Sequence, residues 1–335
     1  MKVAILSPIT WRTPPRQYGP WEQVASIITE GLVKRGVEVT LFATGDSITS
    51  GHLESVCKVP LGDDQPLDPK VWECLHISHL MEKANEFDII HNHFDFLPLT
   101  YSALIHTPML TTIHGFSSSQ ILPVYKKYNK NNAYISISES DRHEDLTYLD
   151  TIYHGLNPED LPFVNEKEGY LLYFGRIHPD KGTHLAIEIA MDAGLPLKIA
   201  GLIQDQNYFQ TYVKPFVDGG RVDYLGNVNP VARNKLLGRA RALLHPICFD
   251  EPFGLSVVEG MMCGTPVIAF ERGSMAEIIV DGRTGFLVSD VRTAVLAVEK
   301  LKEIDPQECH NHACDKFSQD KMIEAYMRSY TQVLS

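Results

Sequence analysis

The stretch that decides the fold runs from residue 242 to residue 270 and reads ALLHPICFDEPFGLSVVEGMMCGTPVIAF. Ala242 to His245 is a short apolar run that predicts a buried strand, and Pro266 to Phe270 predicts a second one. Between them, a helix beginning at Gly254 would carry the chain from one strand to the next. A strand, a helix and another strand in this order are typical of a βαβ unit, whose two strands are parallel.

The same order of elements repeats along all 335 residues. Pro20 to Arg35 has apolar residues at helical spacing and a glycine just beyond its end, which predicts a helix. The polar segment Gly155 to Gly169 is typical of a linker. The other strand candidates are Val3 to Ile9, Val37 to Ala43, Phe87 to His91, Met109 to Ile113, Tyr134 to Ile137 and Thr151 to Tyr153 before this linker, and Leu171 to Phe174, Leu197 to Ala200 and Val222 to Leu225 after it.

This pattern predicts an α/β protein with two Rossmann-like, doubly wound parallel-sheet domains. We expect an N-terminal domain over residues 1–160, a C-terminal domain over 161–315, and a C-terminal helix over 316–335 that packs back toward the N-terminal domain. Parallel sheets of this kind bind ligands outside the carboxyl ends of their strands. Two of them facing each other would hold a ligand in the cleft between.

The charge balance excludes several classes of partner. The chain has 42 Asp and Glu against 30 Lys and Arg, a formal net charge of -12, so we expect no nucleic-acid partner. A run of about 18 apolar residues is missing, and the first residues lead straight into a strand, so we expect a cytoplasmic protein. The local basic run of Lys126, Lys127 and Lys130 could touch a membrane, although a solvated helix end is the better interpretation.

The nearest approach to a metal site in the sequence is Cys309, His310, His312 and Cys314. On a helix, Cys309 and His312 would share one face while His310 and Cys314 would share another, so the ligands would not converge. The chain also has no Asp-x-Asp pair to bridge a metal and a diphosphate. We therefore expect no essential metal and no required cofactor.

A nicotinamide-dependent oxidoreductase would share this topology. Its Gly-x-Gly-x-x-Gly turn, however, follows neither Val3 to Ile9 nor Leu171 to Phe174. The tight turn that brings a pyrophosphate to the helix end is therefore missing, which argues against this class.

Two carboxylates eight positions apart surround the start of the helix at Gly254. The first backbone N–H groups of that helix, at Leu255 and Ser256, would form an anion site. Glu251 lies just before this site and Glu259 lies beyond it, so a sugar, a diphosphate and a ribose could be bound in that order. Carboxylates accept hydrogen bonds from hydroxyl groups, which suits Glu251 to a hexose and Glu259 to a ribose.

Either acid alone would be interpreted as a helix-start or surface charge. Glu259, however, is followed by the small and apolar stretch Gly260 to Ala269. A charge in such a segment is expected to have a partner.

A second group of charged residues joins the strand Leu171 to Phe174 to its helix. Arg176 and Lys181 are two cations at this turn of an acidic protein, and together they could hold a diphosphate. The alternative is that they only keep the surface soluble.

These motifs together resemble the family 4 retaining glycosyltransferases of the GT-B fold, over nearly the whole chain. The residues that carry the resemblance are Gly175-Arg176 with Lys181-Gly182, Glu251 and Glu259 with Phe253-Gly254, Gly264-Thr265-Pro266-Val267, Gly273 with Glu277, Gly282 with Gly285-Phe286, Tyr18-Gly19, His114 after Thr111-Thr112-Ile113, and Ser138-Glu139.

The resemblance implies a hexosyltransferase of the EC 2.4.1 type, which moves a hexose from a nucleotide diphosphate sugar to an acceptor hydroxyl and retains the anomeric configuration. We favour a UDP-sugar such as UDP-glucose, with GDP-mannose as the second option. The acceptor is not indicated. Two alternatives stay open: a GT-B nucleotide-sugar epimerase, and a non-catalytic nucleotide-sugar-binding protein.

The resemblance also implies roles for particular residues. The catalytic residues would be His114 on the transferred sugar, Arg176 and Lys181 on the diphosphate, and Glu251 on the donor sugar; the donor would further contact Gly19, Phe253, Gly254, Leu255, Ser256 and Glu259.

Two positions of the first domain need comment. The family usually has a Gly-Gly pair before the first long helix, and here the pair is Gly19-Pro20, so one amide donor is missing. Acceptor recognition would fall to the polar residues His93 and Asp95 beside aromatic neighbours, although packing at a strand end is an equally good interpretation.

Overall fold

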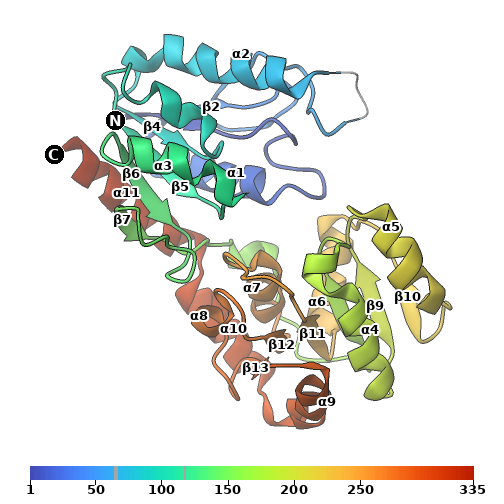
Figure 1. Cartoon of the computed structure of the whole chain (residues 1–335). Helices are drawn as coiled ribbons and strands as arrows, with labels where there is room; N and C mark the ends of the chain where they lie inside the picture. Colours follow the sequence, from blue (N-terminus) through green and yellow to red (C-terminus); the bar gives the residue numbers. More distant parts are fainter. Residues whose placement is uncertain (64–66, 117) are drawn as a thin grey trace. The chain divides into compact units, whose positions relative to one another are not determined.

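The computed structural model describes residues 1–63, 67–116 and 118–335. It divides into two compact units: unit 1 is Met1–Gly155 together with Gln319–Ser335, and unit 2 is Leu156–Ser318. Each unit is a parallel sheet with helices packed against it (Figure 1). The prediction of an α/β protein with two Rossmann-like domains is therefore confirmed.

The sheet of unit 1 has the strand order β3-β2-β1-β4-β5-β6-β7 within the described residues. The order reverses where β1 pairs with both β2 and β4, and ligands bind at such switch points in α/β sheets. The polar segments that follow β4 and β5 therefore lie side by side. The strands are β1 (Lys2–Leu6), β2 (Glu38–Phe42), β3 (His52–Glu54), β4 (Ile89–Asn92), β5 (Met109–Ile113), β6 (Asn132–Ser136) and β7 (Tyr148–Thr151).

Helices cover both faces of this sheet. On one face, Leu80 of α2 and Tyr125 of α3 join the buried core around Leu6 and Ile113. On the other face, α11 packs against α1, and a Cβ at Gly31 would lie 2.6 Å from the Cγ1 atom of Ile323. The helices are α1 (Pro20–Lys34), α2 (Pro69–Glu82), α3 (Leu122–Tyr128) and α11 (Gln319–Leu334), with short 3-10 turns at Ala84–Glu86, Leu97–Tyr101 and Ser119–Ile121.

The sheet of unit 2 has the order β10-β9-β8-β11-β12-β13 across the part of the chain that is described. Its switch point lies between β8 and β11, which pair directly. The strands are β8 (Leu171–Phe174), β9 (Leu197–Ala200), β10 (Val222–Tyr224), β11 (Ala242–His245), β12 (Val267–Phe270) and β13 (Gly285–Val288). The helices are α4 (Thr183–Asp192), α5 (Gln206–Tyr208), α6 (Pro230–Arg239), α7 (Leu255–Met262), α8 (Met275–Ile278), α9 (Val291–Lys300) and α10 (Pro306–Lys316), and α5 continues into a π-turn at Phe209–Val213.

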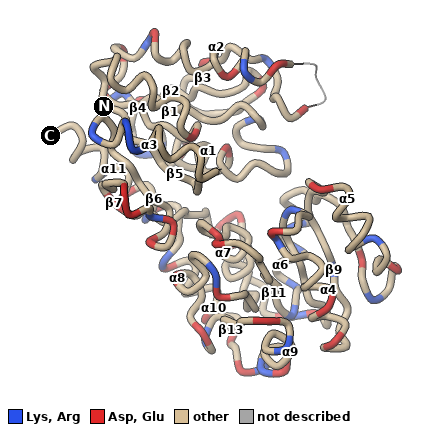
Figure 2. Tube along the Cα trace, in the orientation of Figure 1, with Lys and Arg blue, Asp and Glu red and all other residues tan. Residues whose placement is uncertain are grey.

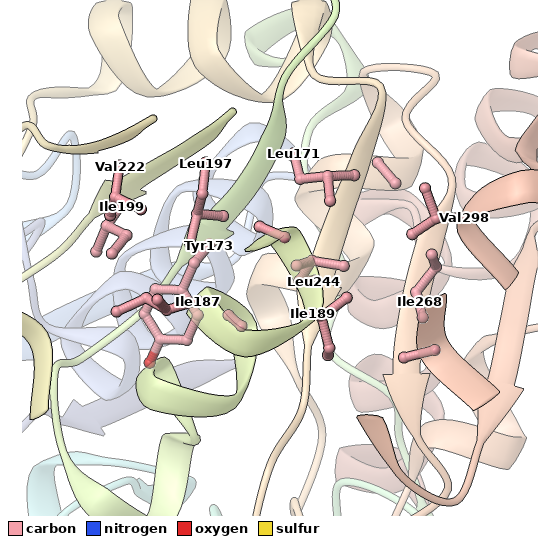
Figure 3. Close-up of a cluster of buried hydrophobic side chains, with 14 of the residues drawn as sticks. Leu171, Tyr173, Ile187, Ile189, Leu197, Ile199, Val222, Leu244, Ile268 and Val298 are labelled. Carbon is pink, nitrogen blue, oxygen red and sulfur yellow. The ribbon is translucent and has the colours of Figure 1, made fainter. Parts of the chain in front are cut away.

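The core of unit 2 holds α4 against the strands that carry the candidate site. Ile187 and Ile189 of α4 pack beside Leu171, Leu244 and Ile268 of the sheet, all of them nearly or fully buried (Figure 3). The turn before α4 is equally tight, because a Cβ at Gly182 would lie 1.9 Å from the carbonyl oxygen of Pro246. The loops after β8 and β11 are therefore held close together.

The histidine residues of α10 hold this helix against neighbouring segments of unit 2. Nδ1 of His310 lies 2.5 Å from the carbonyl oxygen of Met262, and Nε2 of His312 lies 2.9 Å from that of Ile278. Residues 1–63, 67–116 and 118–335 contain no cluster of three or more His, Cys, Asp or Glu side chains arranged to hold a metal ion. In the same residues, no helix combines the length and the apolar character that a membrane crossing requires.

Candidate functional site

The central contact of unit 2 is an ion pair between Lys181 and Glu251. Lys181 ends the short 3-10 turn Pro179–Lys181 after β8, and Glu251 lies in the loop after β11, the neighbouring strand. Nζ of Lys181 lies 2.5 Å from Oε2 of Glu251, and both side chains are largely buried. The ammonium group also lies 4.6 Å from the centre of the Phe249 ring. Residues 70 positions apart thus form one charged centre.

The surroundings keep Glu251 ionised. Burial raises the pKa of this carboxyl, but the charge of Lys181 and the neighbouring His245 outweigh it and leave the pKa at about 2. Nε2 of His245, the last residue of β11, lies 3.4 Å from Oε2 of Glu251. Sequence reasoning missed His245, although its position at the carboxyl end of a central strand was a usable signal. Glu251 is therefore an acceptor-only group suited to hydroxyl donors.

The first turn of α7 lies directly after Glu251. Its N-cap is Gly254, with φ of 91°, and it has no side chain to accept from the first N–H groups of the helix. Phe253 is fixed beside it, since the Ser274 hydroxyl donates to the Phe253 carbonyl over 2.7 Å. The helix start at Gly254 is confirmed, and the N–H groups of Leu255 and Ser256 lie in the first turn, as an anion site needs.

The helices of the two units differ in how their first turns are capped. Side chains of Asn229, Asp290 and Asp305 accept from the first turns of α6, α9 and α10. By contrast, α1, α4 and α7 begin at the glycines Gly19, Gly182 and Gly254, which have no side chain to cap them, although in α4 the His184 N–H donates to the Tyr208 hydroxyl over 3.0 Å. These three helices follow β1, β8 and β11, the central strands of the two sheets. The start of α7, which has no side-chain cap from its N-cap residue, is therefore the one suited to an anionic ligand among these three.

Arg176 lies on the same loop as Lys181. Its guanidinium group donates to the side chain of Gln204, which sequence reasoning missed. The backbone of this loop is held by the Tyr173 hydroxyl, which donates to the Arg176 carbonyl over 2.7 Å. Arg176 and Lys181 thus lie on the same loop, but their side chains have different partners: Arg176 pairs with Gln204, and Lys181 pairs with Glu251.

Glu259 has the partner that its apolar surroundings predicted. Its Oε1 accepts from Nη1 of Arg233, on α6, over 2.7 Å. Burial raises the pKa of Glu259, and the charge of Arg233 opposes that rise. The expectation of a partner is confirmed, whereas Arg233 itself was missed because it lies 26 residues earlier in the chain.

In unit 1, His114 lies among aromatic and imidazole rings. It follows β5 and is 8% exposed. The Trp21 ring from α1 stacks on it, with ring centres 5.3 Å apart and planes 20° apart. Its Nε2 lies 2.9 Å from Nδ1 of His93, and its Nδ1 lies 3.3 Å from Nε2 of His154. Sequence reasoning selected His114 and His93 but missed His154 and Trp21.

Burial keeps these imidazoles neutral. It lowers the pKa of His93 and His114 well below the usual value, and neighbouring imidazoles lower both further. Burial alone brings the pKa of His154 to about 3. The cluster therefore has no positive charge near neutral pH.

His93 and Asp95, the predicted acceptor residues, both follow β4. His93 is fully buried and bonded to His114, and an acceptor contact at His93 stays a prediction. Asp95 adopts a left-handed backbone, with φ of 70°, and its Oδ1 accepts from the Tyr125 hydroxyl over 2.5 Å. An acceptor contact at Asp95 stays a prediction.

Gly19 begins α1 where the chain is crowded. A Cβ at Gly19 would lie 2.8 Å from Cβ of Pro15 and 3.1 Å from Oε2 of Glu22. Oε1 of Glu22 accepts from the Trp11 N–H over 3.0 Å, and burial raises the pKa of Glu22 to about 7. The loop before α1 is therefore anchored by a residue that sequence reasoning did not select.

The basic residues of α3 are visible as a blue stretch in Figure 2. Lys126 forms an ion pair with Asp145, and Nζ of Lys127 lies 5.0 Å from the centre of the Tyr128 ring. Lys130 is exposed. These local contacts suit a solvated helix end, and a membrane contact stays a prediction.

Family models match the chain in two consecutive segments. The family described as Glycosyltransferase Family 4 matches residues 22–159, and the one described as Glycosyl transferases group 1 matches residues 160–320. The chain belongs to the GT4-type glycosyltransferases of the GT-B fold.

Individual proteins agree with this assignment. An uncharacterized glycosyltransferase of Methanocaldococcus jannaschii, MJ1178, is 26% identical over 356 residues, which cover 95% of this chain and 97% of the relative. The structure of sucrose-phosphate synthase from Thermosynechococcus elongatus matches with a TM-score of 0.81 at 19% identity, over 99% of both chains. Anabaena Alr3699/HepE, solved in complex with UDP-glucose, matches with a TM-score of 0.73 at 19% identity, over 99% of this chain and 100% of that one.

Replacing Lys181 by Met should destabilise unit 2 in a pH-dependent way. A carboxyl whose folded pKa is about 2 instead of 4.5 stabilises the fold above pH 4.5 and loses that contribution as the pH falls toward 2. Without Lys181, burial should raise the pKa of Glu251 above 4.5, so the buried carboxylate would destabilise the fold at pH 7 and protonation would relieve that penalty as the pH falls. We expect the variant to be less stable at pH 7 by on the order of 3 kcal/mol, and by less at pH 4.

Calorimetric unfolding at both pH values measures this difference. Lys198→Met is the matched control, because Lys198 pairs with the half-exposed Glu168 and should cost less than about 1 kcal/mol. A Lys181→Met deficit that is equal at pH 7 and pH 4 would contradict the assigned role of the ion pair.

Proposed function

We propose that this protein transfers a hexose from a UDP-sugar, with UDP-glucose favoured, to an acceptor hydroxyl with retention of the anomeric configuration. The observation that carries the proposal is the Lys181–Glu251 pair beside the uncapped start of α7. A nucleotide sugar has a diphosphate next to a ring of hydroxyl groups. The ammonium group and the amide groups suit the diphosphate, and the carboxylate suits the hydroxyls.

The choice of donor is supported by a structural neighbour. Alr3699/HepE has the same fold and was solved with UDP-glucose bound. The ribose of a UDP-sugar would be bound by Glu259, which lies further along the helix whose start would bind the diphosphate. Arg233 donates to the Glu259 carboxylate and would hold it in position for the ribose.

The proposed chemistry is electrostatic. As the bond to the sugar breaks, negative charge grows on the departing diphosphate, and Arg176, Lys181 and the α7 amides would stabilise it. The leaving phosphate oxygen would take the proton of the acceptor hydroxyl on the same face of the sugar. No carboxylate is then needed as nucleophile or general base. His114 would contact the transferred sugar, as the family resemblance implies.

The first experiment identifies the donor and the reaction. UDP-glucose, GDP-mannose and ADP-glucose are compared for the rise in melting temperature they cause. UDP-glucose is then incubated with and without a set of sugar and polyol acceptors, and products are followed by proton NMR. We expect UDP-glucose to stabilise the protein most, and an α-linked product to form only when an acceptor is present.

Each other outcome has a defined meaning. Epimerised nucleotide sugar without acceptor would establish the epimerase alternative. Binding with no turnover on any acceptor would favour a nucleotide-sugar-binding protein. A β-linked product would overturn the retaining mechanism, and a larger shift with GDP-mannose would change the donor.

Arg176→Ala should lower kcat more than it weakens donor binding. If Arg176 acts on charge that develops during the reaction, its removal raises the barrier and leaves the ground state nearly unchanged. Steady-state kinetics and calorimetric titration with UDP measure the two effects. Arg239→Ala, which removes a half-exposed arginine paired with Glu168, is the control and should change neither. Equal losses in kcat and binding for Arg176→Ala would indicate a plain binding role.

Glu259→Gln should weaken UDP binding by about 10- to 100-fold, because a hydrogen bond to a charged acceptor contributes about 1.5–3 kcal/mol. Calorimetric titration with UDP and with 2′,3′-dideoxy-UDP separates ribose contact from structural damage. The dideoxy compound lacks the ribose hydroxyls, so the native protein and the variant should bind it equally weakly. A variant that loses the same factor for both ligands would show that the effect comes through Arg233.

A further inference from the structure

Two nitrogen atoms of unit 2 face the same oxygen atom of the Glu251 carboxylate. Nζ of Lys181 lies 2.5 Å from Oε2 and donates to it, and Nε2 of His245 lies 3.4 Å from the same oxygen. Among the described residues, Nε2 of His245 is buried and has no hydrogen-bond partner. Lys181 therefore makes the hydrogen bond to Oε2, while His245 lies beside it with an unused nitrogen.

The chemistry of Glu251 decides where His245 carries a proton. The pKa of Glu251 is about 2, so its carboxylate is ionised near neutral pH and can only accept hydrogen bonds. Even a neutral imidazole has one N–H group, which can be placed at Nε2. A proton there faces a negative charge 3.4 Å away, whereas a lone pair would be repelled by that charge. Nε2 of His245 is therefore the donor nitrogen.

The two nitrogen donors differ in how firmly they are placed. His245 is the last residue of the central strand β11, and its side chain is buried. Lys181 reaches Oε2 at the end of a flexible four-carbon chain. Glu251 itself is fixed, because the Ser274 N–H donates to its carbonyl over 2.9 Å and a Cβ at Gly273 would lie 2.3 Å from the same oxygen. Of the two donors, only the lysine can therefore move far from the carboxylate.

A nucleotide diphosphate would compete with Glu251 for the ammonium group. Under the proposed function, Lys181 binds the diphosphate while Glu251 binds the donor sugar. Two anions would then share one cation, and the attraction between Lys181 and the carboxylate would weaken as the ammonium group is drawn toward the phosphates. Glu251 would become a buried carboxylate that has lost part of its compensation, which is costly unless another donor replaces it.

We propose that His245 is a positioning residue for Glu251: it donates from Nε2 to the carboxylate and holds it for the donor sugar when the diphosphate draws Lys181 away. The inference rests on the proposed function in one respect, that Lys181 and Glu251 bind the two parts of the donor. A closure of about 0.5 Å would bring the present contact into the range of a charge-assisted hydrogen bond. His245 would act on the sugar only through the carboxylate.

Lys181→Met removes the ammonium group without any ligand, so a double-mutant cycle tests the replacement directly. His245→Leu should lower the folding equilibrium constant about tenfold more in the Lys181→Met chain than in the native chain, because only there is His245 the remaining donor. Urea unfolding of the whole chain measures both costs. His312→Leu, which removes a partly buried histidine bonded to the Ile278 carbonyl, is the control and should cost the same in both chains.

Ligand binding tests the role of His245 at the site. Calorimetric titration compares UDP, which lacks the sugar, with UDP-glucose. In His245→Leu, we expect the affinity for UDP-glucose relative to that for UDP to fall about tenfold, because the carboxylate is no longer held for the sugar hydroxyls. His245→Gln places an amide donor near the position of Nε2 and should recover most of this ratio. His312→Leu should leave the ratio unchanged.

The outcomes separate this inference from the proposed function. Equal costs of His245→Leu in both chains, a native affinity ratio in folded His245→Leu, or no recovery in His245→Gln would overturn the positioning role. If the double variant does not fold, long-range ¹H–¹⁵N NMR of the native chain decides, and a His245 ring without a proton on Nε2 would overturn the proposal. If the native protein binds neither UDP nor UDP-glucose, the proposed function fails, while the unfolding cycle still shows whether His245 replaces Lys181 at Glu251.

Discussion

The candidate site of unit 2 depends on one interaction, the buried ion pair between Lys181 and Glu251. Removing both charges from water costs several kcal/mol, and the pair offsets this only with close geometry. The fold supplies that geometry through the pairing of β8 with β11 and the contact of Gly182 with Pro246. The pair keeps a carboxylate ionised and an ammonium group in place where the sheet changes direction.

The start of α7 differs from the starts of several other helices in unit 2. Asn and Asp side chains satisfy the first N–H groups of α6, α9 and α10, and such caps stabilise a helix by about 1 kcal/mol. Gly254 begins α7 and supplies no side-chain cap, whereas α4, which also begins at a glycine, has its His184 N–H bonded to the Tyr208 hydroxyl. Helix α7, which follows β11, thus lacks a stabilising cap, which is consistent with amide groups that bind an anion.

Sequence patterns predicted much of the fold and failed in identifiable places. The bounds of β8, β9 and β11 agree with the prediction, because strands buried on both faces are continuous apolar runs. β3 (His52–Glu54) was missed because it is short and half polar, and β13 because its glycine start was interpreted only as a motif. β7 lies at Tyr148–Thr151, earlier than the predicted Thr151 to Tyr153, since an edge strand has a weaker apolar signal.

By itself, the sequence determined which chemical groups stand at the ends of the parallel strands, and the motifs that assign the chain to its family. Only the tertiary structure decided the partners. Lys181 meets Glu251 across 70 residues, His154 meets His114 across 40, and Arg233 meets Glu259 across 26. No local spacing encodes such pairs, because they arise when parallel strands bring distant loops to one edge of a sheet.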